Sequence, residues 1–161
     1  FLMLGVVPFR SLRQVFAVGA AEYYQTPFMK WVARFTNVIP VDSDSNLESA
    51  MRAGATGLRL GKVLILFPEG ERTIDGELKT FKKGAPILAA HLGVPIVPVA
   101  LKGLWEMWPR TKPIDWRYVG AWRRHRVRIA IGPPVTVSAS EPYADAAARL
   151  RATVDELWQP L

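Results

Sequence analysis

Five apolar residues in succession, Val63–Phe67, constrain the fold of this chain more than any other feature. A run without polar interruption is typical of a strand that is covered on both faces. Such strands occur in α/β folds, where helices pack on both faces of a largely parallel sheet. Strand-like and helical patterns alternate along the rest of the chain. We therefore expect a single layered α/β domain over residues 1–161, with a mixed, largely parallel central sheet flanked by helices.

The other predicted strands are short. They are Gln14–Val18, Val38–Val41, Pro95–Leu101 and Arg126–Ile131. Pro95 and Pro98 cannot donate backbone hydrogen bonds, so part of their strand should lie at an edge or beside irregular structure.

The predicted helices have recognisable ends. Thr26 can cap a helix that starts at Pro27 and whose apolar residues recur at helical spacing. We expect that apolar face to be buried; it comprises Phe28, Trp31, Val32 and Phe35. Ser45 and Glu48 fit a capping box for a second helix ending near Gly61. A third should run from about Pro86 to Gly93. A last one should carry one apolar face, made of Tyr143, Ala147, Leu150, Val154 and Leu157.

Composition excludes some classes of chemistry. The chain has no cysteine, which excludes disulfides, thiolate metal sites and thiol catalysis. Its net charge is +7, and the segment Lys102–Arg128 holds eight basic residues, two acidic residues and four of the six tryptophans. The apolar opening Phe1–Phe9 is too short to span a bilayer and lacks the flanks of a signal peptide. We interpret it as the middle of a helix whose start is missing.

The loop after the Val63–Phe67 strand carries the most specific group of polar residues. Ligand sites in open α/β sheets favour the carboxyl ends of strands. Gly70 allows backbone to approach a ligand, and Arg72 can hold a phosphate with two hydrogen bonds. Glu69 can orient Arg72 or accept from a hydroxyl. Taken alone, this loop is also compatible with a tight turn and a surface ion pair.

A second basic loop, Lys79–Gly84, precedes a predicted helix N-terminus. Free backbone N–H groups and the helix dipole favour an anion at that position. Lys82 and Lys83 would add point charges. A solvated basic loop is the alternative interpretation of this segment.

Three segments together resemble the 1-acylglycerol-3-phosphate acyltransferase family. Phe67–Thr73 resembles its "FPEGTRS" block, Phe81–Ala85 its "FKKGA" block, and Val94–Val99 its "VPIVPV" strand, in the same order and spacing. Asn37–Asp42 resembles the strand before the family's glycerol-phosphate block. The resemblance covers about residues 1–101 and continues weakly to Pro134. It implies a phospholipid/glycerol acyltransferase domain with the glycerol-3-phosphate acyltransferase-like fold.

The chain departs from the family pattern at three points. Glu71 replaces the usual threonine, and Ser43 stands where a basic residue is common. The family's catalytic motif is a histidine followed after four residues by an aspartate, and neither His91 nor His125 makes such a pair. We interpret His91 as a partly buried structural residue and His125 as part of a basic surface. We therefore expect an acyltransferase domain that lacks its N-terminal part, cut just after the His-Asp motif.

The resemblance implies transfer of a fatty acyl group from acyl-CoA or acyl carrier protein to the hydroxyl of a lysophospholipid such as 1-acylglycerol 3-phosphate. Substrate-binding candidates are Glu69, Gly70, Arg72, Lys82 and Lys83, and no catalytic residue, metal site or further cofactor is expected in the chain. The missing histidine would act as general base, so the fragment itself should be inactive. A non-catalytic lipid- or phosphate-binding module of the same fold is the alternative.

The segment Lys102–Arg128 also bears on partners and location. Tryptophans among basic residues favour an anionic membrane surface, although a packed crossover would give the same composition. We expect the enzyme at the cytoplasmic face of a membrane, peripheral or anchored by a missing N-terminal segment. Acyl carrier protein is a further candidate partner, and fusion to another enzyme stays open. A nucleic-acid-binding domain is disfavoured, because the basic charge is local and no standard motif accompanies it.

Overall fold

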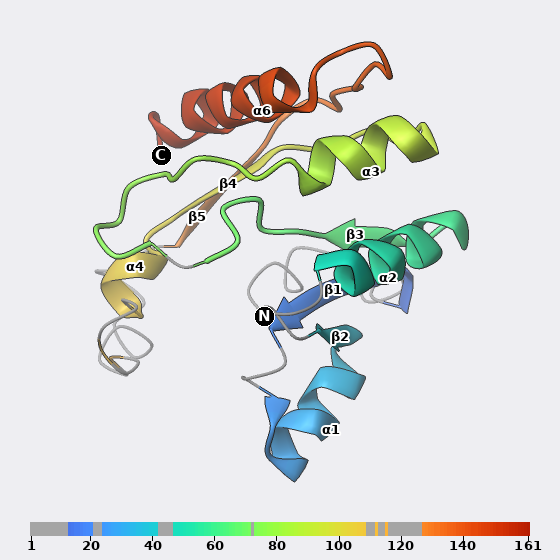
Figure 1. The fold of residues 1–161 in the computed structure, drawn as a ribbon. Helices are drawn as coiled ribbons and strands as arrows, with labels where there is room; N and C mark the ends of the chain where they lie inside the picture. The colour runs from blue at the N-terminus through green and yellow to red at the C-terminus, as the bar shows by residue number, and fades with distance from the viewer. Residues whose placement is uncertain are drawn as a thin grey trace. The chain divides into compact units, whose positions relative to one another are not determined.

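The computed structural model describes residues 13–20, 24–41, 47–71, 73–108, 112, 115 and 127–161 (Figure 1). It divides into two compact units, Phe1–Leu66 and Phe67–Leu161, and each is described here by itself. That both units belong to one acyltransferase domain stays a prediction. Within the described ranges, no helix is long and apolar enough to cross a bilayer.

The first unit is a three-stranded parallel sheet with helices packed against it. Its elements are β1 Val15–Ala20, α1 Pro27–Phe35, β2 Val38–Val41, α2 Leu47–Arg59 and β3 Val63–Ile65. The strand order is β2-β1-β3, with Val18 opposite Ile39 and Phe16 opposite Leu64. Parallel neighbours joined by helical crossovers are the hallmark of α/β folds. The predicted class, and the positions of the first two strands, are thus confirmed.

Packing between β1 and α2 explains a glycine in the middle of a helix. Gly57 is buried, and a β-carbon built on it would lie 2.2 Å from Cζ of Phe16. The Phe16 side chain is itself only 4% exposed, so it cannot move into solvent to make room. Glycine therefore occupies position 57 despite its low helix propensity, because only glycine lets the Phe16 ring lie on the helix backbone.

The predicted ends of α1 and α2 agree with the structure. Thr26 Oγ1 accepts a hydrogen bond of 3.2 Å from Met29 N, and Pro27 is the first helical residue. Gly61 follows the end of α2 with a φ of +73°, which glycine adopts without strain. Ser45, the proposed cap of α2, lies outside the described residues, while Glu48 is in the first turn and pairs with Arg52.

The prediction that the aromatic face of α1 is buried is wrong. Phe28, Trp31 and Phe35 are 68%, 62% and 76% exposed. The helix packs against β2 instead through a different face, on which Ala33 is buried. Helical periodicity shows that apolar residues share a face, but it carries no information on what covers that face.

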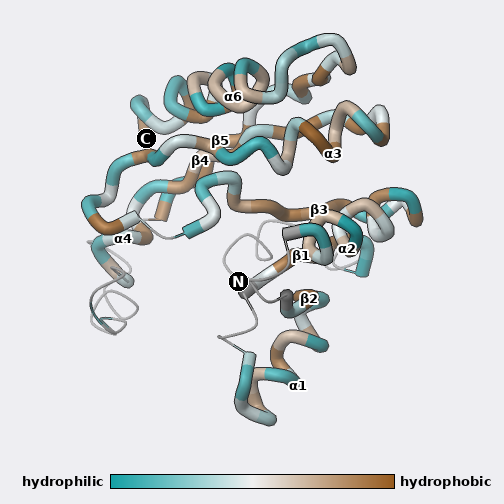
Figure 2. Tube along the Cα trace, in the orientation of Figure 1, coloured by the Kyte–Doolittle hydropathy of each residue, from teal (hydrophilic) through white to brown (hydrophobic). Residues whose placement is uncertain are grey.

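The prediction for the Val63–Phe67 strand is also partly wrong. The strand β3 ends at Ile65 and lies at an edge of the three-stranded sheet. The strand is hydrophobic in Figure 2, yet its Val63 is 54% exposed, and Phe67, which follows the end of the strand, is 62% exposed. A run of apolar residues shows that the segment is hydrophobic, but it carries no information on what covers each of its faces.

The second unit is built around an antiparallel pair and its C-terminal helix. Its elements are α3 Gly84–Leu92, β4 Val99–Lys102, α4 Leu104–Met107, β5 Arg128–Ile131 and α6 Tyr143–Trp158. Ala100 lies opposite Ala130 in the β4–β5 pair, and α6 contacts both strands. One buried cluster joins loop, strand and helix; it comprises Phe81, Ala100, Ala147, Leu150 and Val154. The predicted apolar face of the last helix is confirmed for Ala147, Leu150 and Val154, and Leu157 packs against the same cluster. Tyr143 is only half-buried.

Pro98 and Gly93 in this unit also act as predicted. Regular pairing in β4 starts only after Pro98, and the earlier Ile96 makes an isolated antiparallel bridge to Val135. Gly93 ends α3 in the left-handed conformation, with its N–H donating to Ala89 O.

Candidate substrate-binding site

The residues Phe67–Glu71 form a tight turn at the start of the second unit. Gly70 N donates to Phe67 O at 3.1 Å, and Gly70 has a φ of +76°. A residue with a side chain rarely adopts this conformation, which explains why glycine occupies the position. The turn thereby exposes its backbone at Gly70.

The basic loop lies directly beside this turn. Lys82 N donates to Pro68 O at 2.7 Å, and Lys79 N donates to Glu69 Oε2 at 3.0 Å. Two segments that are separate in the sequence are thus joined by hydrogen bonds at both ends. The Glu69 carboxylate uses one oxygen to hold the second loop in place, a role that the sequence did not indicate.

The side chain of Lys82 lies against the backbone of the turn. A β-carbon built on Gly70 would lie 2.5 Å from Lys82 Nζ and 2.6 Å from its Cε. The lysine side chain therefore lies over the bare backbone of Gly70, with its ammonium group beside the turn. The structure thus brings together three of the five predicted binding residues, Glu69, Gly70 and Lys82.

Charge in the two loops is only partly neutralised. Glu71, the residue that departs from the family pattern, pairs with Lys79 at 2.9 Å. Among the described residues, no carboxylate pairs with Lys82 or Lys83, both of which are exposed. An anion with several oxygens, such as a phosphate monoester, suits two ammonium groups of this kind.

Lys83 lies at the start of α3 rather than on the turn. It occupies the N-cap position, where no side chain caps the helix. Because Pro86 has no N–H and Ile87 N donates to Lys83 O, the first-turn donors beside Lys83 are the N–H groups of Gly84 and Ala85. The helix dipole adds partial positive charge there.

Three further residues singled out in the sequence are Arg72, His91 and His125. Arg72 lies outside the described residues, as does His125. His91 is exposed rather than partly buried, and its Nε2 lies 3.2 Å from the Tyr143 hydroxyl. No group of three His, Asp or Glu side chains capable of holding a metal occurs in the described parts of the chain.

Arg151 of α6 fixes the basic loop, and sequence reasoning missed it. Its Nε donates to Lys79 O at 3.1 Å and its Nη2 donates to Leu78 O at 3.0 Å. The signal was present, because Arg151 borders the apolar face that carries Leu150 and Val154. A guanidinium at such a border can reach backbone carbonyls of a neighbouring segment.

Trp105 contacts the segment that joins the turn to the basic loop. Its indole Nε1 donates to Ile74 O at 3.3 Å, and its ring packs where a side chain on Gly76 would otherwise lie. Trp105 belongs to the basic, Trp-rich segment Lys102–Arg128, for which the sequence favours contact with an anionic membrane surface. In the structure it is 39% exposed, so part of the ring supports the loop.

Asp75 stabilises a small turn within this loop and should make it sensitive to acid. Its Oδ1 accepts from Thr73 Oγ1 at 2.7 Å and from Glu77 N at 3.0 Å, and these bonds lower the pKa of its carboxyl. Folding thus favours the ionised form. The stabilisation that the Asp75 carboxylate gives to this turn is present above the unfolded-state pKa of about 3.9. It is lost as pH falls through the lower folded-state pKa.

We expect faster hydrogen exchange at Glu77 N as pH falls through that range, because the turn loses its ionised acceptor. An Asp75→Asn variant should not show this pH dependence.

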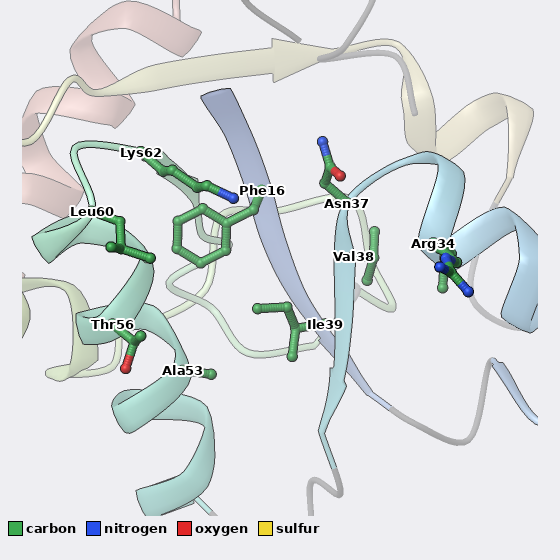
Figure 3. A pocket seen from close by; sticks show the side chains of 11 residues that line it. Phe16, Arg34, Asn37, Val38, Ile39, Ala53, Thr56, Leu60 and Lys62 are labelled. Atoms are coloured by element: carbon green, nitrogen blue, oxygen red, sulfur yellow. The ribbon is translucent and has the colours of Figure 1, made fainter. Parts of the chain in front are cut away.

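A separate hollow of about 370 Å³ lies in the first unit (Figure 3). Ala53 and Thr56 of α2, with Leu60 just after the helix, line one side, while Val38 and Ile39 of β2 line the other. It lies near the amino ends of the strands, because Phe16 and Val38 are among their first residues. Ligand sites in open α/β sheets favour the opposite, carboxyl ends. The loop pair Phe67–Lys83 is therefore the stronger candidate.

Comparison with known proteins agrees with the motifs that form this loop pair. The family described as "Acyltransferase" matches residues 1–102, well over half of the chain. The chain belongs to the acyltransferase family. Both loops lie inside the matched range, whereas Arg151 lies beyond it.

The similar proteins within the acyltransferase family share one substrate name. A 1-acyl-sn-glycerol-3-phosphate acyltransferase of Brassica napus chloroplasts is 32% identical over 133 residues, covering 81% of this chain and 37% of the relative. One from Pseudomonas aeruginosa is 28% identical over 85% of this chain and 50% of the relative. The resemblance to the 1-acylglycerol-3-phosphate acyltransferases is thereby confirmed. The chain spans between about a third and a half of these relatives.

A solved structure supports the fold as well. The 1-acyl-sn-glycerophosphate acyltransferase PlsC from Thermotoga maritima superposes with a TM-score of 0.67 at 25% sequence identity. The match covers 91% of this chain and 56% of that protein. The predicted acyltransferase fold is therefore confirmed.

Proposed function

We propose that the protein containing this chain acylates 1-acylglycerol 3-phosphate, and that the loop pair Phe67–Lys83 binds its phosphate. The observation that carries the proposal is the Lys82 ammonium lying over the bare backbone of Gly70. Two lysines without a carboxylate partner among the described residues suit a phosphate, and the similar proteins are named for a phosphate-bearing acceptor.

The chain contributes binding and positioning to this reaction. Lys82 and Lys83 would neutralise the phosphate, and Arg72 would add a two-pronged contact. Glu69 keeps the two loops joined through Lys79 N. Fixing the phosphate places the acceptor hydroxyl, and well-oriented groups can supply roughly 7–11 kcal/mol of barrier reduction.

The reacting groups are the acceptor hydroxyl and an acyl thioester. The base would be a histidine outside these 161 residues, which removes the hydroxyl proton as the oxygen attacks the thioester carbonyl. The carbon–sulfur bond breaks, and the thiol leaves with a proton. No cysteine is present to form an acyl-enzyme in this chain. The donor is acyl-CoA or an acylated acyl carrier protein, and the free coenzyme A or carrier-protein thiol is the leaving group. The isolated fragment should bind the acceptor weakly without turnover.

Membrane contact through Lys102–Arg128 is part of the proposal. Within the described portion of that segment, Lys102 Nζ lies 4.5 Å from the centre of the Trp158 ring. A lysine held in this cation–π contact has less freedom to reach a lipid phosphate. Arg123, Arg124 and Arg126 are therefore better candidates than Lys102 for such contacts.

The experiment that tests the proposal uses the full-length protein and distinguishes an effect on the acceptor KM from an effect on the donor KM. We expect Arg72→Ala and Lys82→Ala each to raise the KM for 1-acylglycerol 3-phosphate about tenfold or more, since each removes a charged hydrogen bond. The KM for acyl-CoA should change little. Arg59→Ala, which removes an exposed arginine at the end of α2, serves as the control.

Two results would contradict this assignment. Unchanged acceptor kinetics in both variants would remove the loop pair from the phosphate site. Acceptor binding without turnover, in a full-length protein that carries no His-x-x-x-x-Asp motif, would support the non-catalytic lipid-binding module instead.

A further inference from the structure

Helix α1 carries an exposed row of stacked aromatic rings. The Phe28 and Trp31 ring centres are 6.3 Å apart and those of Trp31 and Phe35 are 5.6 Å apart, both in stacked geometry. More than half of each side chain is open to solvent. Three large rings in contact form a continuous apolar stripe rather than scattered exposed residues, and such a stripe marks an interaction surface.

The charges of α1 all have one sign. Lys30 and Arg34 are exposed, and the helix contains no acidic residue. A turn of about 100° per residue places both cations on one flank of the stripe, between Trp31 and the buried Ala33. The helix thus has three sides, which are a face packed on β2, an aromatic stripe and a basic edge next to it.

This arrangement favours an anionic lipid surface over another protein. Tryptophan and phenylalanine beside lysine and arginine suit the boundary between head groups and acyl chains. Lysine is depleted from the cores of protein interfaces, whereas cations at a membrane gain from anionic head groups. The face of α1 that carries Ala33 packs on β2 and lies opposite the stripe, so the stripe can meet a flat surface while the helix stays in place.

We propose that α1 is an interfacial helix, which places Phe28, Trp31 and Phe35 among the lipids of an anionic membrane and sets Lys30 and Arg34 against their phosphates. This assignment goes beyond the acyltransferase reaction and does not depend on it. It also differs from the Lys102–Arg128 contact, because the two surfaces consist of different residues and can be altered separately.

The test measures vesicle binding of the full-length protein by co-sedimentation, without turnover. The vesicles contain phosphatidylcholine with about 30% phosphatidylglycerol, and phosphatidylcholine alone is the neutral arm. We expect the combined variant Phe28→Ser, Trp31→Ser, Phe35→Ser to bind anionic vesicles at least about tenfold more weakly. Lys30→Glu with Arg34→Glu should weaken anionic binding severalfold and leave the weak neutral binding unchanged.

Matched controls come from other exposed residues. Leu60→Ser, Val97→Ser and Ile131→Ser remove apolar side chains that are 71%, 48% and 58% exposed, and together they should change affinity less than twofold. Arg59→Glu with Lys62→Glu is the charge control near the end of α2. Thermal unfolding and turnover of a short-chain, soluble lysophosphatidate test whether each variant is folded.

A second readout locates the helix directly. The 161 residues contain no cysteine, so the substitution Phe35→Cys gives one labelling position in this chain once any cysteine outside it is replaced. The emission of an environment-sensitive fluorophore attached to the new thiol should shift to the blue on anionic vesicles. The same fluorophore attached after Arg59→Cys should show no shift.

Three outcomes would overturn the proposal. The first is unchanged vesicle affinity in the aromatic variant. The second is a large fall in melting temperature with unchanged vesicle affinity, which would show that another part of the full-length protein covers α1. The third is loss of binding only on neutralising Arg123, Arg124 and Arg126. Absence of turnover in the unaltered protein would contradict the proposed reaction but leave the vesicle result intact.

Discussion

Gly70→Ala is expected to lower kcat/KM for 1-acylglycerol 3-phosphate by about 10- to 100-fold. The added methyl group would lie 2.5 Å from Lys82 Nζ, so the ammonium group must leave its place over the turn. Losing a hydrogen bond from a charged group costs roughly 1.5–3 kcal/mol, which corresponds to this range. Steady-state kinetics with varied acceptor at saturating acyl-CoA measures the effect.

Gly93→Ala separates this displacement from backbone strain. Gly93 has a φ of +64°, close to that of Gly70, but a β-carbon there would meet nothing within 4 Å. Both substitutions therefore cost about 1–2 kcal/mol of strain, while only one moves a lysine. The double variant Gly70→Ala, Lys82→Ala should be no worse than Lys82→Ala alone. Equal acceptor kinetics for Gly70→Ala and Gly93→Ala would show that Lys82 does not contact the acceptor.

Arg151→Met is expected to destabilise the second unit by roughly 2–3 kcal/mol and to loosen the basic loop. The substitution keeps most of the apolar side chain but leaves the carbonyls of the half-buried residues Leu78 and Lys79 without their guanidinium donor. We expect faster hydrogen exchange at Lys79 N and Lys82 N and a raised KM for the acceptor. Denaturant unfolding and exchange mass spectrometry measure the first two effects, and steady-state kinetics the third.

Arg149→Met is the matched control for this prediction. Arg149 also lies on α6 and also makes several hydrogen bonds, but its main partner is the Glu141 carboxylate at the surface. Exposed ion pairs of this kind contribute little to stability. Equal loss of loop protection in the two variants would indicate a general weakening of α6 rather than a specific role of Arg151.

Local chemistry made most of the fold predictable. Thr26 and Pro27 identified a helix start, and Gly61 and Gly93 identified helix ends, because capping depends on a few adjacent residues. Burial was less predictable. The apolar faces of α1 and of the last helix have similar periodicity, yet only the last helix packs into a core. The partner of a face is set by tertiary contacts, which periodicity does not contain.

The sequence predicted which residues belong to the candidate site better than it predicted the contacts between them. The motifs identified Glu69, Gly70 and Lys82, and the structure brings these three together. The Glu71–Lys79 pair and the contacts of Arg151 depend on segments 8 and 72–73 residues apart in the chain. Such pairings arise from the fold. The position of Arg151 beside an apolar face indicates that it can reach a neighbouring segment, but no local motif identifies which carbonyls it binds.

The contacts of Arg151 also bear on where this domain can be cut. Every recognisable sequence block lies before residue 102, the end of the range that matches the family. A shorter protein ending there would retain all its signature residues yet lose the guanidinium that fixes Leu78 and Lys79. The same holds on the ribosome, where the loop can take its final shape only after the C-terminal helix has been synthesised.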